Sequence, residues 1–166
     1  GMSSNADLSM NLMKAVGIKS PVKDIKGDEF SVDGWFDGYK WIWPFTSTVE
    51  DRRFMNADLG PEVKCAASAV WAYDEAKPML ALKTITKIAP YLEAAGYVGP
   101  ISLDMVLDEA GTPCGCGWRV PALHTVCMLI KGNLGKQLAL LVGGRLDGLE
   151  VDTEAYAMSI LVSVAP

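Results

Sequence analysis

Residues 28 to 45, DEFSVDGWFDGYKWIWPF, decide the fold of this chain. Apolar residues alternate along the first half, and a second aromatic run from Tyr39 to Trp43 follows the pair Asp37-Gly38. An Asp-Gly pair between two such runs is the strongest short-range signal for a β-hairpin. The sequence therefore predicts two antiparallel strands joined at Asp37-Gly38.

Strand and helix patterns alternate after this hairpin. No glycine fingerprint of a dinucleotide-binding fold accompanies them, so the expected fold class is α+β, a largely antiparallel sheet with flanking helices. Asp74 should cap the longest helix, Pro90 should kink its last turns or split them, and Gly96 should end it. We expect helices over residues 7–16, 74–96, 121–132 and 134–145; strands over 65–73, 101–107 and 113–118, with a buried strand over 155–165; and a polar loop over 46–64.

The composition describes a globular chain of one domain. Half of the 166 residues are apolar, the mean hydropathy is +0.19 and the net charge is -5. An acidic chain without a basic stripe is a poor nucleic-acid binder, and its apolar runs fall short of the roughly 20 residues that cross a bilayer. We therefore expect a cytoplasmic protein, with no nucleic-acid or membrane partner, whose four cysteines are reduced.

Two clusters of residues leave alternatives open. Cys114 and Cys116, with His124 and Cys127, provide ligands for a zinc ion, but their spacing fits no familiar zinc module; the other interpretation is small residues in one arm of a hairpin. The tryptophans, Trp35, Trp41 and Trp43, either fill the core or form an exposed self-association surface.

Four stretches together resemble the ATP-grasp ligases, most closely the phosphoribosylamine–glycine ligase family of purine synthesis. They are GDEFSVDGWFDG (27–38), EDRRFMNADLGPEVKCAASAVW (50–71), GYVGPISLDMVLDEAGTPCGCGWRVPAL (96–123) and GRLDGLEVDTEAYAMSILVSVAP (144–166). The resemblance implies a single truncated domain over 1–166, similar to the C-terminal lobe of the ATP-grasp fold. Residues 1–26 would form an N-terminal helix and linker, 27–120 the core lobe, and 121–166 the C-terminal helices and strand.

The resemblance also implies which residues would carry chemistry. The family joins a carboxylate to an amine through an acyl phosphate made from ATP, a reaction that needs magnesium and arginine or lysine where negative charge develops. In this chain Arg119 would be catalytic and Asp104 would hold the metal. The substrate-binding positions would be Glu29, Arg52, Arg53, Asp58, Gly60 and Pro61. As residues on a polar loop, Arg52 and Arg53 are equally well explained as solvated charges, and Glu29 as a surface strand residue.

The chain departs from the family where the metal should bind. The returning strand of the hairpin lacks the family's Glu-x-Asn, and its metal-binding glutamate falls on Gly115, Cys116 or Gly117. Glycine and a neutral thiol do not hold magnesium, which prefers oxygen ligands. The family's small nucleotide lobe and N-terminal domain are also missing from the match.

These departures favour a catalytically inactive remnant over a working enzyme. The isolated chain would bind no cofactor and act as a binding or assembly module, and surface left by the missing lobe would make it a homo-oligomer, a dimer. The alternative is a carboxylate–amine ligase that uses ATP and magnesium when a separate nucleotide-binding chain supplies the missing lobe.

Overall fold

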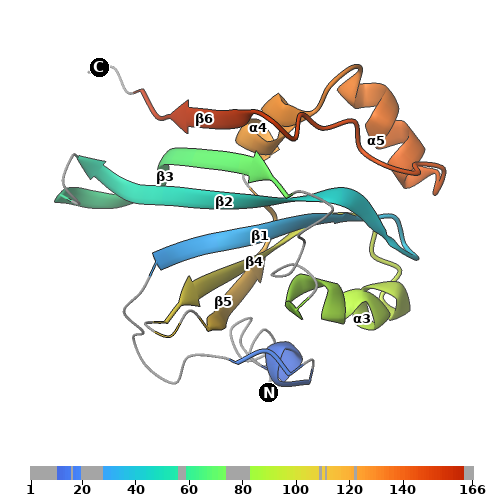
Figure 1. Cartoon of the computed structure of the whole chain (residues 1–166), viewed down its shortest axis with the longest axis horizontal. Helices are drawn as coiled ribbons and strands as arrows, with labels where there is room; N and C mark the ends of the chain where they lie inside the picture. Colours follow the sequence, from blue (N-terminus) through green and yellow to red (C-terminus); the bar gives the residue numbers. More distant parts are fainter. Residues whose placement is uncertain are drawn as a thin grey trace.

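A computed structural model describes residues 11–15, 17–19, 28–55, 59–73, 83–108, 110, 112–121 and 123–162. Within these ranges the strands form one six-stranded antiparallel sheet of order β5-β4-β1-β2-β3-β6 (Figure 1). The strands are β1 (Asp28–Phe36), β2 (Trp41–Met55), β3 (Leu59–Ala72), β4 (Gly99–Leu107), β5 (Pro113–Arg119) and β6 (Tyr156–Ile160). The helices are η1 (Ile85–Ile88), α3 (Ala89–Ala94), α4 (Leu123–Val126), η2 (Cys127–Leu129) and α5 (Leu134–Val142).

The predicted hairpin at Asp37-Gly38 is confirmed as the turn between β1 and β2. The Asp37 carboxylate accepts hydrogen bonds from the backbone N–H groups of Tyr39 at 2.8 Å and Lys40 at 2.7 Å. Gly38 has a φ of +105°, a conformation that side chains disfavour. The Asp-Gly pair therefore fixes the register that places β1 at the centre of the sheet.

The loop predicted over residues 46–64 is wrong. Residues 41–55 form β2, and β3 begins at Leu59, with register shifts between Asp51 and Arg53 and between Arg53 and Met55. Thr46 and Thr48 bond to Asp33 on the polar face of the sheet, and Ser47, on the other face, donates to the backbone carbonyl of Ser31 at 2.8 Å. The polarity of this stretch therefore reflects hydrogen bonds made within the sheet, not a loop.

The helices are shorter than the sequence predicted. Residues 11–15 are helical and Gly17 follows with a φ of +68°, as expected for a helix stop, while residues 1–10 and 16 lie outside the described residues. Residues 74–82 of the long predicted helix also lie outside them. Pro90 lies in the first turn of α3, which follows directly on η1, so the last turns are split beside Pro90, as one of the two expected outcomes has it, and Gly96 ends the helix with a φ of +62°.

The C-terminal half follows the predicted order of elements. Helical segments lie within the predicted ranges 121–132 and 134–145, as α4 with η2 and as α5. β4 and β5 form the predicted hairpin. The strand predicted to be buried over 155–165 is β6, which lies at the edge of the sheet and pairs with β3, so the described parts of segments 27–120 and 121–166 share one sheet. Residues 163–165 of this prediction lie outside the described residues. The prediction of burial is wrong because alternate residues of β6 face outward.

The two faces of the sheet are covered differently. One face packs Val32, Phe45, Leu103 and Met105 against Met13 and Ile85. On the other face, α4, η2 and α5 cover the end near β3 and β6 through a cluster that includes Val70, Val126 and Leu141 (Figure 1). The rest of that face, over β1, β2, β4 and β5, carries polar side chains. No helix among the described residues is long and apolar enough to span a membrane.

The tryptophans belong to the core. Trp35 is 3% exposed, and the half-buried Trp41 and Trp43 lie with their ring centroids 5.4 Å and 4.7 Å from that of Phe45. The alternative of an exposed tryptophan surface for self-association is therefore wrong.

We predict that Gly34→Ala destabilises the protein. A Cβ at Gly34 would lie 2.6 Å from a ring carbon of Phe45 and 2.8 Å from one of Trp41, so two packed rings would have to move. Overpacking of this kind costs about 1–3 kcal/mol of the free energy of unfolding, measurable by urea denaturation. Gly117→Ala is the matched control, because a Cβ there meets nothing within 4 Å. Equal stability of the two variants would contradict the packing assigned to Gly34.

Candidate functional site

Polar side chains from four neighbouring strands gather on the open face of the sheet. The register aligns Ser31 with both Thr48 and Asp104, and Asp33 with both Thr46 and Ser102, so these residues share one face. Since successive strand residues point to opposite faces, Glu50 joins the same row two residues after Thr48. Short-range alternation on each strand thus builds one continuous polar surface.

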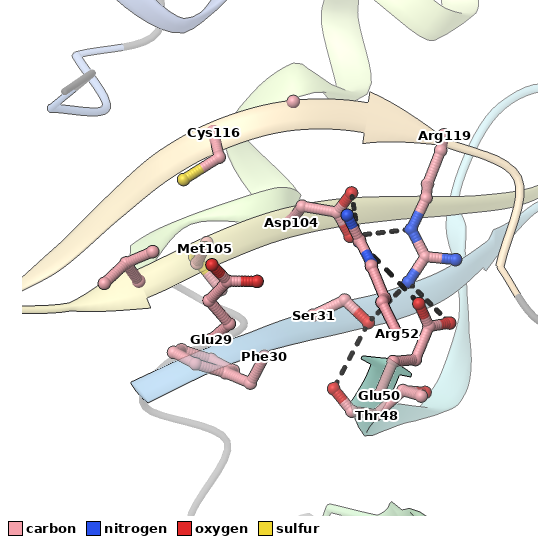
Figure 2. Close-up of a pocket in the computed structure, with 12 residues that line it drawn as sticks. Glu29, Phe30, Ser31, Thr48, Glu50, Arg52, Asp104, Met105, Cys116 and Arg119 are labelled. Atoms are coloured by element: carbon pink, nitrogen blue, oxygen red, sulfur yellow. Dashed lines mark hydrogen bonds and ion pairs between the residues drawn. The ribbon is translucent and has the colours of Figure 1, made fainter. Parts of the chain in front are cut away.

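Arg119, at the end of β5, is the centre of this surface. Its Nε donates to Asp104 Oδ1 at 2.7 Å, and its terminal nitrogen lies 3.0 Å from Glu50 Oε1 and 3.5 Å from Ser31 Oγ. Figure 2 shows the Arg119 side chain reaching from β5 across β4 toward β2. One guanidinium therefore links carboxylates from two strands that are not neighbours in the sheet.

Arg52 closes the cluster from the other side. Its terminal nitrogen lies 3.7 Å from Glu50 Oε2 and 3.9 Å from Asp104 Oδ2, the carboxylate oxygens that Arg119 leaves open (Figure 2). The four residues form a closed ring of alternating charge, which we call the ion-pair ring. The Glu50 side chain is only 8% exposed. Its charge is therefore compensated inside the protein and not by water.

The electrostatics of Arg119 reflect this environment. Burial alone lowers the pKa of its guanidinium, but Asp104 and Glu50 outweigh burial and hold that pKa above its usual range. Arg119 is permanently charged, and its charge is already matched by the two carboxylates.

Asp33 lies two residues along β1 from Ser31, on the same face of the sheet as the ion-pair ring, and is 1% exposed. Its Oδ1 accepts hydrogen bonds from the hydroxyls of Ser102 and, at 3.2 Å, of Ser31. Its Oδ2 accepts from Thr48 at 2.5 Å and Thr46 at 3.4 Å. Four hydroxyls from three strands thus surround one buried carboxyl group and tie β1, β2 and β4 together.

Burial raises the pKa of the Asp33 carboxyl above its usual value. The hydroxyl hydrogen bonds and the charge of Arg119 act in the opposite direction but only reduce this effect. The neutral acid is therefore favoured at Asp33 more than at an exposed aspartate.

A pocket of about 290 Å³ opens beside the ion-pair ring. Glu29, Met105, Cys116 and Gly117 are among the other residues that line it, and Figure 2 shows Cys116 on β5 on the same side as Glu29. Partial burial, with the charges of Glu29 and Asp104, raises the pKa of the Cys116 thiol. The thiol is therefore kept neutral and is a poor nucleophile.

The structure brings together only some of the predicted site residues. Arg119, Asp104, Arg52 and Glu29 line the same pocket. The other predicted positions do not line this pocket. Arg53 donates a hydrogen bond to the backbone carbonyl of Gly60 at 3.1 Å and pairs with Glu62 at 3.2 Å. Pro61 is exposed in β3, and Asp58 lies outside the described residues. The functional roles of all these residues stay predictions.

Glu50 and the hydroxyl residues were not among the residues predicted from the sequence. Glu50 fell inside the predicted loop, and Ser31, Asp33, Thr48 and Ser102 carried no motif. No signal in the sequence marked them, because residues 46–53 are polar at every position except Val49 and show no strand period.

The donor set does not fit a magnesium ion. Both oxygens of Asp104 and of Glu50 face arginine nitrogens, and the residue paired with Asp104 on β5 is Gly117, which has no oxygen to offer from a side chain. In the part of the chain that is described, no group of three or more His, Cys, Asp or Glu side chains is placed to hold a metal. The metal role of Asp104 stays a prediction that belongs to the ligase alternative.

The cysteine and histidine residues do not form the alternative zinc site. Cys114 and Cys116 are on β5, whereas His124 lies within hydrogen-bonding distance of Ser159 on β6, at 3.3 Å. β5 and β6 are the opposite edges of the sheet. All four cysteines lie within the described residues and are free thiols.

The fold is that of the ATP-grasp enzymes, an α+β architecture around a mostly antiparallel sheet. Among solved structures, the chain is similar to phosphoribosylamine–glycine ligase of Thermotoga maritima, with a TM-score of 0.61 and 18% identity over 83% of this chain and 36% of that one. It is also similar to the L-amino acid ligase of Bacillus licheniformis, with a TM-score of 0.65 and 15% identity over 98% of this chain and 54% of that one. The chain thus spans about a third to a half of these enzymes.

No protein-family model matches the chain, and no curated protein matches its sequence. At these identities the similarity establishes the fold and leaves the activity to be argued from the site.

We predict that Asp33→Asn changes the pH dependence of stability. A carboxyl whose pKa is higher in the folded state than in the unfolded chain stabilises the fold below its usual pKa of 3.8, and this stability is lost as the pH rises through the raised value. The free energy of unfolding of the wild type should therefore fall, relative to that of Asp33→Asn, as the pH rises from 3 toward neutrality. Urea titrations of both proteins measure the difference, and parallel profiles would refute it.

Proposed function

We propose that this chain is a phosphoribosylamine–glycine ligase-like ATP-grasp module that binds or assembles but does not turn over ATP by itself. The observation that carries the proposal is the ion-pair ring. Asp104 and Glu50, two carboxylates of the open face, pair with Arg119 and Arg52, so their oxygens are not free to bind metal ions.

Phosphoryl transfer makes this arrangement unfavourable for catalysis. The transferred group develops charge on several oxygens, and the enzymes that move it supply uncompensated cations, metal ions and arginines, at that place. In the ion-pair ring each guanidinium already has carboxylate partners, so a triphosphate would have to displace Glu50 or Asp104. Displacing a carboxylate that is 8% exposed leaves a buried charge without compensation.

The alternative is an ATP-dependent carboxylate–amine ligase, with a link to purine synthesis, completed by a separate chain. The convergence of Arg119, Asp104, Arg52 and Glu29 on one pocket favours it, because a ligase site needs these charges close together. A nucleotide lobe from a partner would then have to open the ion-pair ring before ATP and magnesium bind.

We further propose a homodimer. β6 is an edge strand whose outward side chains, Tyr156, Met158 and Ile160, are 75%, 67% and 73% exposed. An uncharged edge strand with apolar side chains favours association with a second strand, and a symmetric pair of identical chains is the commonest way to cover it.

Calorimetric titration with ATP and magnesium tests the main proposal. We expect no saturable heat with a Kd tighter than about 1 mM, because neither guanidinium nor carboxylate of the ion-pair ring is available to the nucleotide. Circular dichroism of the same sample serves as the control that the protein is folded. Micromolar binding that requires magnesium would contradict the proposal and support a ligase that needs no partner.

Light scattering after size exclusion tests the dimer. The wild type should elute with twice the chain mass of 17.8 kDa, and Met158→Asp should elute as a monomer because it puts a charge on the β6 surface. Met128→Asp, at a residue of η2 that is 65% exposed, is the control and should leave the dimer intact. A wild-type protein that stays monomeric at high micromolar concentration overturns this proposal.

A further inference from the structure

The carboxylate of Glu50 lies between two arginines, in the way that a bound carboxylate ligand would. One of its oxygens is 3.0 Å from a terminal nitrogen of Arg119 and the other is 3.7 Å from one of Arg52, and the side chain is only 8% exposed. Asp104 contacts the same two guanidiniums (Figure 2). Without Glu50, two cations would face a single carboxylate and the site would carry a net positive charge. The place of the Glu50 carboxylate therefore suits a small carboxylate, whose two oxygens match guanidinium groups.

Strands β1 and β2 separate at Glu50. Among the described residues, the two strands are paired no further than Ser31 and Thr48, and beyond this point Glu50 is paired with Ser68 on β3. Continued in the same register, the ladder would place Glu29 directly opposite Glu50, and like charges in such positions are destabilising. The gap opens into the pocket of the ion-pair ring, which both glutamates line. Glu50 therefore lies at the edge of a hollow.

Asp104, by contrast, belongs to the wall of this site. It lies within β4 and is paired on both sides, with Ser31 on β1 and Gly117 on β5. Its Oδ1 accepts a hydrogen bond from Arg119 Nε at 2.7 Å, the shortest contact of the ion-pair ring. Asp104 therefore orients Arg119, whereas Glu50 occupies the place that the two arginines leave between them.

Two hollows meet at the ion-pair ring. The pocket of about 290 Å³ and a larger groove of about 1070 Å³ are both lined by all four residues of the ring. The groove extends from there toward β6, and its wall includes the apolar side chains Val63, Val120, Leu123 and Ile160. Once the Glu50 side chain is removed, a small anion can therefore reach its place from either hollow.

From this geometry we infer that Glu50 is an internal ligand that closes a carboxylate-binding site between Arg119 and Arg52. The contact is autoinhibitory, because the wild-type chain fills the site with its own side chain and leaves no place for a free carboxylate. The inference rests on the proposed function, since it names the residue that keeps the site of the inactive module closed.

The test is chemical rescue of Glu50→Ala in the whole chain, because this substitution removes the internal carboxylate and leaves space for acetate. Unfolding in urea is measured at neutral pH with sodium acetate, with an equal concentration of sodium chloride, and with acetamide added to the chloride solution. In about 0.2 M acetate, mass action with a Kd of about 20 mM lowers the equilibrium constant for unfolding of Glu50→Ala about tenfold. Acetamide, which is neutral, should have no such effect, and the wild type should respond alike to acetate and chloride.

Two further variants serve as controls. Glu62→Ala removes a glutamate that also pairs with an arginine, Arg53 at 3.2 Å, but lies outside the ion-pair ring and is 71% exposed. It should respond to acetate no more than the wild type does, and so reports the general effect of the salt. Glu50→Ala combined with Arg119→Gln should lose the rescue, because acetate then lacks the guanidinium that holds it.

Three results would overturn the inference: equal responses of Glu50→Ala and Glu62→Ala to acetate, rescue by acetamide as large as by acetate, or full rescue of the variant that lacks Arg119. If Glu50→Ala does not fold in chloride, circular dichroism in the same solutions replaces the urea titration. Recovery of the fold in acetate alone is then the expected result, and no recovery in acetate overturns the inference.

The failure of this inference is distinguishable from that of the proposed function, because the rescue is measured without nucleotide. Absence of rescue removes the carboxylate site and leaves the inactive module standing if ATP does not bind. Micromolar binding of ATP with magnesium to the wild type removes the inactive module whatever acetate does.

Discussion

Charge compensation on one half-buried face of a sheet is the constraint on which this structure depends. Glu50 and Asp104 lie on a surface where water cannot fully solvate them, so each needs a cation close by. A magnesium ion would need these oxygens free, whereas here Arg119 and Arg52 face both oxygens of each carboxylate. The guanidinium groups are part of the chain, so the compensation is permanent and needs no bound ion.

The fold holds this ring in place from both sides of the sheet. On the far face, Val32 and Leu103 alternate with the polar residues and anchor β1 and β4 in the core. On the same face as the ring, the hydroxyls around Asp33 tie the same strands together. On the open face, the helices after β5 leave the ring accessible and extend the surface into an apolar groove. Stability and binding surface thus use the same strands, and register errors would affect both.

The sequence predicted the parts of the fold that local chemistry decides. The Asp37-Gly38 pair predicted the turn between β1 and β2, and Gly17 and Gly96 end their helices as expected. The strand over residues 41–55 was not predictable from polarity, since Thr46, Thr48 and Glu50 are compensated by residues far away in the chain. For the same reason Glu50 was not predicted as a site residue, whereas Asp104 and Arg119, which lie in the same ion-pair ring, were predicted through a family resemblance. Burial of β6 was predicted from its apolar content, which cannot tell an edge strand from a central one.

The most direct measurement of the central claim is a double-mutant cycle between Glu50→Gln and Arg119→Gln, read from the free energy of unfolding in urea. If the ion-pair ring compensates its own charges, either single substitution leaves the charge of the partner residue unpaired, whereas the double substitution removes both charges. We therefore expect a coupling energy of about 1–3 kcal/mol. Effects that add within about 0.5 kcal/mol would show that the two residues do not depend on each other, which contradicts the account.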